Sequence, residues 1–250
     1  LSQVLNKSDE ASIGSSLDKI FEINNDLVSS LITNLSNEDN TFLTTSNSEA
    51  NNAIKEKIYT QMLNDSDNIE IIGKIISKSD GDTVEKMINI VSLSDTNDAN
   101  SNLSLQVLSS VADANALSST SLDTSAQSQV NQLIEGAVAN AGSNAGDSAM
   151  LANVITKSDP DTINMLVVNI QTVDSQKSNI GMIGDGSSSL SLQVLSSVAD
   201  NNFENNKSFE TSAQTQVNKL IVSAVANAGS NAGDSGMLAN VIMKSDAVMM

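Results

Sequence analysis

The chain carries almost the same 22 residues twice. Residues 138–159 read VANAGSNAGDSAMLANVITKSD, and residues 225–246, which lie 87 positions later, read VANAGSNAGDSGMLANVIMKSD. Within one chain a catalytic site is seldom duplicated, whereas a structural unit often is, and self-similarity at a period of tens of residues is typical of repeat architectures. This duplication constrains the fold more than any other feature of the sequence.

The tripeptide Lys-Ser-Asp marks the phase of the repeat. It ends at Asp9, Asp80, Asp159 and Asp246, each time after an apolar stretch, so the successive intervals are 71, 79 and 87 residues. Four copies in one phase predict about three complete units. The predicted division is a partial unit over 1–9, unit 1 over 10–80, unit 2 over 81–159, unit 3 over 160–246, and the start of a next unit or a tail over 247–250.

Each unit contains four stretches with helical periodicity, which we name segments A to D in chain order. Segment A follows the marker and segment D ends in it. Their apolar residues recur at intervals of three and four, which places them on one face of an α-helix. In unit 2 the stripes are Val84, Met87, Ile88 and Val91 in A, Leu105, Leu108, Val111 and Ala112 in B, Val130, Leu133, Ile134, Ala137, Val138 and Ala141 in C, and Leu151, Val154 and Ile155 in D.

Isolated helices of this length are marginal in water, because nucleation costs more free energy than a few turns return. Each segment must therefore bury its stripe against a neighbour. Short connections rich in Asn, Ser and Gly favour antiparallel pairs, which predicts an all-α fold, an α-solenoid in which A/B and C/D hairpins stack around a thin core. The connection between A and B lengthens from unit to unit, so we expect these loops to project from one edge.

The composition excludes several classes of function. The net charge is −18 and every one of the 12 cationic residues is a lysine, so the chain lacks the basic face and the arginine forks that nucleic-acid binding uses. The absence of Cys and His removes thiol nucleophiles, disulfides, histidine bases and the usual zinc ligands. No run of 18 apolar residues is present, so no membrane-spanning segment is predicted.

The connection after segment A of unit 2 is the candidate metal site. It reads SDTNDAN and places Asp95, Asn97, Asp98 and Asn100 at the close spacing that calcium-binding loops use, although the full EF-hand pattern is missing. The alternative is that these residues cap helices and form turns. The recurrence of KSDGDT as KSDPDT favours capping for the Asp residues at the start of segment A. Calcium is therefore the one cofactor that the sequence leaves open.

Two patterns suggest catalysis at first sight. The Gly-rich NAGSNAGDS, at 140–148 and 227–235, lacks the Lys and the spacing of a phosphate-binding loop, and it predicts instead a helix C-cap at Gly142 and an N-cap at Asp147 or Ser148. Serine is abundant, but there is no histidine and no nucleophile-elbow motif. The repeated Lys-Ser pairs stand where a helix ends and where Lys favours the helix dipole. The chain is therefore predicted to be no enzyme, with no catalytic residue.

Tandem units, abundant Asn, Ser and Asp, and the absence of Cys, His, Trp and Arg together give a chain that resembles the very large tandem-repeat proteins of bacterial surfaces. The resemblance implies a stalk, fibre, filament or coat segment at the cell surface or outside the cell. Its partners would then be neighbouring repeats of the same longer chain, or further copies. Residue 1 falls inside a D segment, in phase with Leu151, which predicts a piece of a longer array or a subunit completed by a neighbour.

A second hypothesis is a binding scaffold that engages a protein or a glycan through its variable A–B loops. In units 2 and 3 the sequences of the helix faces barely differ, whereas those of the A–B loops do. This favours a structural body whose variable loops lie at its edges. A cytoplasmic location is the alternative to the cell surface. A third possibility is an adhesin segment made rigid by calcium, which requires the Asp-rich loops to be ordered by metal.

Overall fold

The computed structural model describes residues 43–44, 49–63, 68–94, 102–118, 122, 124–141, 145–179, 188–205, 208–228 and 232–244. Every regular element in these ranges is an α-helix, which confirms the predicted all-α class. The helices are α4 (Glu49–Leu63), α5 (Ile69–Ile76), α6 (Gly81–Ser94), α7 (Leu103–Ser118), α8 (Thr124–Ala139), α9 (Ala145–Lys157), α10 (Pro160–Asn179), α11 (Leu190–Asn205), α12 (Thr211–Asn227) and α13 (Ala232–Lys244).

The helices reproduce the predicted segments. Helices α6 to α9 are segments A to D of unit 2, α10 to α13 are those of unit 3, and α4 and α5 are segments C and D of unit 1. The partial unit 1–9, segments A and B of unit 1, and the A–B loops at 95–101 and 180–187 lie outside the described residues. No helix in the described ranges is both long and apolar enough to span a membrane.

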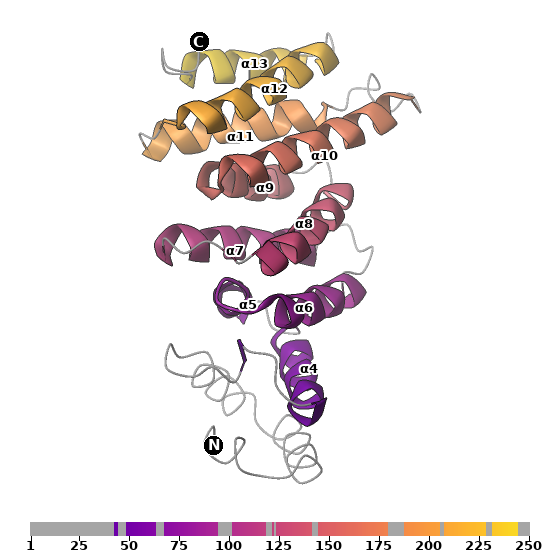
Figure 1. The fold of residues 1–250 in the computed structure, drawn as a ribbon. Helices are drawn as coiled ribbons and strands as arrows, with labels where there is room; N and C mark the ends of the chain where they lie inside the picture. Colours follow the sequence, from indigo (N-terminus) through magenta and orange to yellow (C-terminus); the bar gives the residue numbers. More distant parts are fainter. Residues whose placement is uncertain are drawn as a thin grey trace.

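The helices form two parallel rows in an elongated stack (Figure 1). One row contains α4, α6, α8, α10 and α12, and the other contains α5, α7, α9, α11 and α13. Every one of these helices except α12 packs most extensively on a helix two places away in the chain, within its own row, whereas α12 packs slightly more on α11. Between the rows, segment B packs more extensively on segment C than on segment A, which differs from the A/B and C/D pairing expected from the sequence.

The core is continuous along the stack and almost wholly aliphatic. Every apolar residue of the four stripes predicted for unit 2 is buried. Burial of one Val, Leu or Ile side chain stabilises a fold by about 1.5–3 kcal/mol, so short helices that are marginal alone are held by their neighbours. In unit 3 the A and B stripes are buried as well, whereas part of the C and D stripes reaches the surface at the α12–α13 end.

Small residues allow the helices of one row to approach closely. At Gly73, in α5, a Cβ atom would lie 2.3 Å from the Ser110 hydroxyl oxygen and 2.5 Å from the Ser110 carbonyl carbon. The same Ser110 hydroxyl donates a hydrogen bond to the Ile69 carbonyl at 3.0 Å, which fixes α7 against α5. The contact is backbone against backbone, so it cannot be relieved by turning a side chain.

We expect Gly73→Ala to lower the free energy of unfolding by about 1–2 kcal/mol, because overpacking costs about 1–3 kcal/mol and outweighs the gain in helix propensity. Gly136→Ala is the matched control, since it lies inside α8 and no atom stands within 4 Å of its added Cβ. That change should stabilise the protein by about 1 kcal/mol. Urea denaturation measures both, and midpoints that move in the same direction would contradict the close approach of α5 and α7.

Candidate functional site

The predicted calcium ligands Asp95, Asn97, Asp98 and Asn100 all lie outside the described residues. Within the described ranges, no group of three or more His, Cys, Asp or Glu side chains is placed to hold a metal ion. The calcium site therefore stays a prediction. The repeat offers a comparison for Asp95. It lies 15 positions after the marker residue Asp80, and Asp174 lies 15 positions after the marker residue Asp159.

Asp174, near the end of α10, is a fully buried carboxylate with three donors. It accepts hydrogen bonds from the backbone N–H of Leu190 at 2.7 Å and of Ser191 at 3.0 Å, and from the Ser191 hydroxyl. These two N–H groups belong to the first turn of α11, which has no intrahelical acceptors for them. The negative charge also interacts favourably with the helix dipole. Asp174 therefore fixes the start of α11 against the end of α10.

The marker aspartates cap the A segments, as the sequence predicted. The Asp80 carboxylate accepts a hydrogen bond from the Thr83 N–H at 2.9 Å. The Asp159 carboxylate accepts bonds from the Thr162 N–H at 3.0 Å and from the Thr162 hydroxyl at 2.8 Å. Asp147 and Ser148, predicted as N-caps, lie instead inside the first turn of α9, which begins at Ala145, three or four residues earlier than expected.

A four-residue polar cluster joins segments B and D of unit 2, and we name it the polar clamp. The Asn153 side-chain amide donates to the Ser109 hydroxyl and to the Asp113 carboxylate, both at 2.9 Å. The Lys157 ammonium binds the same carboxylate. The clamp therefore ties α9 to α7 across the outer surface of their row.

The same clamp recurs in unit 3, with every member displaced by 87 positions. Asn240 donates to Ser196 at 2.9 Å and to Asp200 at 2.7 Å, and Lys244 binds Asp200 at 2.6 Å. Burial opposes ionisation of Asp200, but hydrogen bonds from Lys244 and Asn240, with the charge of Lys244, outweigh it and hold the pKa of this carboxyl below its ordinary value. In both units these contacts join a B helix to a D helix, so the cluster binds the two helices together.

Sequence reasoning did not find the clamp. Its members are about 40 residues apart in the chain, and only the packing of α7 on α9 brings them together. The sequence did contain one signal for it. The same polar residue types recur at matching positions of segments B and D in units 2 and 3. That signal shows that the four residues are repeated together, but not that they touch.

Two hollows lie beside the unit 2 clamp. One, of about 250 Å³, is lined by α7, α8, α9 and the start of α10, and aliphatic and polar side chains share its lining about equally, with Gln127, Asp159 and Thr162 among the polar ones. The other, of about 610 Å³, is open and crosses α5, α7 and α9, where Glu70, Lys74 and Gln106 line it. Lys157 borders both hollows, and its ammonium is bound to Asp113. Neither hollow brings a serine and a free base together.

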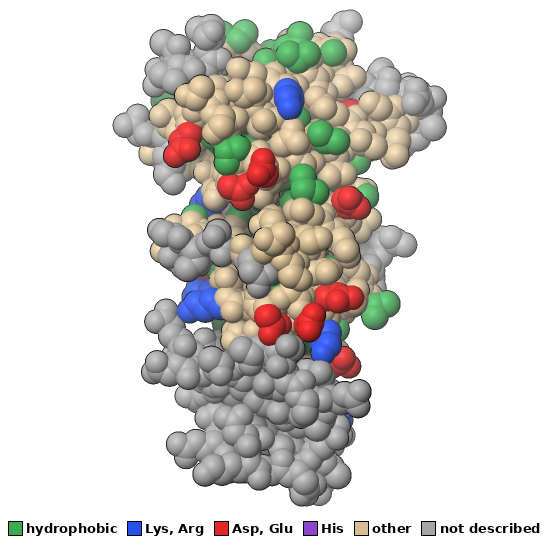
Figure 2. All heavy atoms as spheres, viewed as in Figure 1, with side chains coloured by type: hydrophobic (Ala, Val, Ile, Leu, Met, Phe, Trp, Pro, Cys, Tyr) green, Lys and Arg blue, Asp and Glu red, His purple; other side chains and the backbone are tan. Residues whose placement is uncertain are grey.

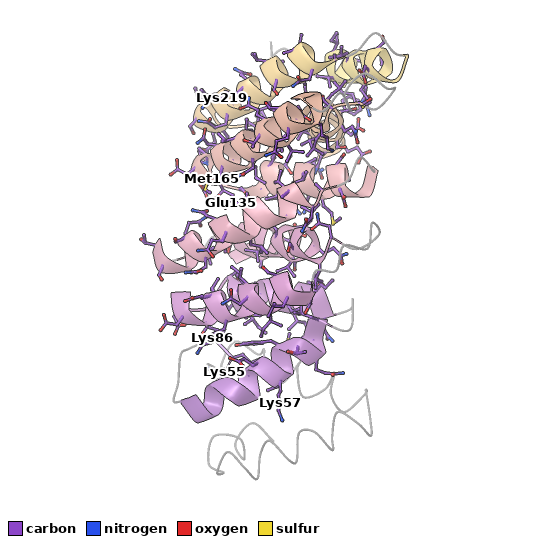
Figure 3. The ribbon with its side chains drawn as sticks, turned by 90° about the vertical axis from the view of Figure 1, so that its right-hand side faces the viewer. Lys55, Lys57, Lys86, Glu135, Met165 and Lys219 are labelled. Atoms are coloured by element: carbon purple, nitrogen blue, oxygen red, sulfur yellow. The ribbon has the colours of Figure 1, made fainter. Side chains whose placement is uncertain are left out.

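Among the described lysines, Lys55 in α4 has the most perturbed pKa. It is buried on the side of α4 that approaches α6, where Lys86 also lies, whereas Lys57 is on another face of the helix (Figure 3). Burial lowers the pKa of Lys55 to about 8, with the positive charge of Lys86 acting in the same direction and the Asp80 carboxylate opposing it. One turn further on, the Tyr59 hydroxyl donates to the Leu43 carbonyl at 2.5 Å, and burial raises the pKa of that phenol above its ordinary value.

We expect the free energy of unfolding to rise with pH from about 8 to about 10. In this range the unfolded chain keeps a proton on Lys55, whose unperturbed pKa is about 10.4, while the folded chain has lost it. Above about pH 10 the trend should reverse, because Tyr59 ionises first in the unfolded chain. Lys55→Met should abolish the rise, because the group that loses its proton in the folded chain is then absent. Urea titrations across pH measure this, with the exposed Lys57→Met as control, and a rise that survives in Lys55→Met would contradict the assignment.

No known protein family, no curated protein and no solved structure matches this chain.

Proposed function

We propose that the chain is a non-enzymatic structural segment of an α-solenoid array. In this proposal it contributes length to a stalk, fibre, filament or coat of a longer surface or extracellular protein. The observation that carries it is the polar clamp, because units 2 and 3 build the same α7–α9 and α11–α13 interface from the same four residue types. An interface that is repeated in register specifies stacking, which is the property that an array needs.

The arrangement of the two rows supports the proposal. Each helix meets its own row neighbours and the adjacent helices of the other row, so contacts are local along the stack. Architectures of this kind grow by adding units, because each unit only needs to match the next. The acidic surface keeps such a body soluble, since Asp and Glu groups are spread along it (Figure 2).

The experiment is an immunoblot of the cells that make the protein, with an antibody against residues 160–246, before and after protease treatment of intact cells. A very large band that disappears on treatment is the expected result, since a surface array is long and accessible. A discrete band near 26 kDa that survives treatment would overturn both the array and the surface location. An unrelated cytoplasmic protein, probed in parallel, shows that the cells stayed intact.

A binding scaffold is the second candidate, and the open hollow of about 610 Å³ across α5, α7 and α9 is the feature that favours it. Its lining mixes the charged Lys74 and Glu70 with the amide of Gln106 and the apolar Leu117, a combination suited to a polar ligand such as a glycan. A glycan array probed with the chain and with Gln106→Leu tests it. Binding that is lost in the variant supports the scaffold, and no binding by the chain removes it.

A further inference from the structure

The α12–α13 end of the stack exposes apolar residues whose counterparts in unit 2 are buried. Ile155 in α9 is 0% exposed, whereas Ile242, at the same position of α13, is 65% exposed. Val138 in α8 is likewise buried, and its counterpart Val225 in α12 is 57% exposed. Hydrophobic side chains accordingly reach the surface at this end of the molecule (Figure 2).

Among the described residues, a helix pair, α10 and α11, covers unit 2, and no such pair covers unit 3. Helix α10 packs on α8 and α11 packs on α9. Polar contacts fix the register of both helices. Gln127 of α8 donates to Thr162 of α10 at 3.4 Å, and Asn201 of α11 donates to Thr156 of α9 at 3.3 Å. The next unit thus begins by covering the C and D helices of the unit before it.

The uncovered face is a near copy of the covered one. Residues 223–246 match residues 136–159 at 21 of 24 positions, and the helix bounds agree to within one residue. One of the three differences is Met243, which replaces Thr156 and makes the α13 face more apolar. Just before the matched stretch, α12 has Val222 at the position of Glu135 in α8, which is also a change from a polar to an apolar side chain. The α12–α13 face is thus chemically equivalent to the α8–α9 face that α10 and α11 cover, and more apolar, so it is suited to the same kind of occupant.

We propose that the outer face of α12–α13 is a docking surface whose occupant is a helix pair of the α10–α11 type, carried by a further repeat of the same polypeptide. That the occupant belongs to the same polypeptide rests on the proposed array. That it is a helix pair with aliphatic stripes rests on the α10–α11 pair, which covers the equivalent face of α8 and α9. The occupant carries aliphatic stripes like those of α10 and α11.

A chain extended by one repeat tests the proposal, with residues 160–246 added once more directly after Asp246. The natural chain has no cysteine, so Ile242→Cys introduces a unique thiol. We expect a maleimide to label this thiol rapidly in the 250-residue chain and at least about 100-fold more slowly in the extended chain, where labelling requires local opening. Leu117→Cys, which is 82% exposed on α7, should be labelled at the same rate in both chains.

Equal labelling of Ile242→Cys in the two chains would overturn the proposal. Slow labelling already in the 250-residue chain, with a rate that falls as the protein concentration rises, would overturn it in favour of a second copy as the occupant. The labelling result is separate from the immunoblot. A surviving 26 kDa band removes the surface array and, with it, the further repeat as the source of the occupant, but leaves the apolar docking surface itself. A thiol that stays unprotected in the extended chain removes the docking surface alone.

Discussion

Asp174→Ala is expected to lower the free energy of unfolding by about 3–4 kcal/mol, one of the largest single-residue effects in the described part of the chain. The change removes the acceptor of three hydrogen bonds and leaves the N–H groups of Leu190 and Ser191 without it in a buried place. An unsatisfied buried donor costs about 1–3 kcal/mol, and the lost interaction with the helix dipole adds to that cost. Urea denaturation followed by circular dichroism measures the total.

The effect should be confined in space as well as large. Amide hydrogen exchange should accelerate first in the opening turn of α11, because that turn loses its anchor on α10. Asp174→Asn should cost less than alanine, since one carbonyl oxygen still accepts while the charge is gone. The control is Glu204→Ala, an exposed change in α11 that should stay within about 0.5 kcal/mol. If Asp174→Ala costs no more than Glu204→Ala, the anchoring role is wrong.

The same reasoning applies to the predicted calcium loop. Asp95 occupies the register position of Asp174, so in the helix-positioning interpretation its substitution destabilises α7 with or without metal. In the calcium interpretation, the thermal midpoint of the chain depends on added calcium, because a ligand that binds only the folded state stabilises it. Local spacing cannot separate these interpretations, because a carboxylate that caps a helix and one that binds calcium occupy the same kind of turn.

The limits of sequence reasoning follow from what periodicity encodes. Recurrence at three and four residues identifies the buried face of a helix, and Ile163, Leu166 and Val167 are indeed fully buried. It does not identify the neighbour that covers that face. The expected pairing of consecutive segments therefore differs from the observed rows, in which next-but-one helices pack most extensively.

The polar clamp could not be predicted from the sequence for a related reason. Asp113 and Lys157 belong to different helices, and their contact exists only because α9 lies in the row directly beside α7. Once the rows are known, the clamp can be carried from unit 2 to unit 3 by register alone. Segment D of unit 1 departs from it, because Lys74 stands at the position of Asn153 and pairs instead with Glu70 in its own helix at 2.5 Å.

Ile155→Ala and Ile242→Ala should differ by several kcal/mol, although the two residues have almost the same local sequence. Both follow Leu-Ala-Asn-Val near the end of a D helix, so the change in helix propensity is the same for both. Ile155 is enclosed between the rows, and truncation to alanine leaves a cavity that costs about 2–5 kcal/mol. Ile242 is 65% exposed, and its truncation should stay within about 0.5 kcal/mol.

The comparison becomes decisive in the chain extended by one repeat, because there a further helix pair covers α13. Ile242→Ala should then cost as much as Ile155→Ala, while the cost of Ile155→Ala stays unchanged, since its own neighbours are the same in both chains. Urea denaturation of the four proteins gives the two differences directly. Equal costs in the 250-residue chain would mean that the α13 face is already covered in solution, contrary to its exposure here. If Ile242→Ala lowers the free energy of unfolding only in the extended chain, the contribution of Ile242 to stability comes from packing against the added helix pair and not from its own helix.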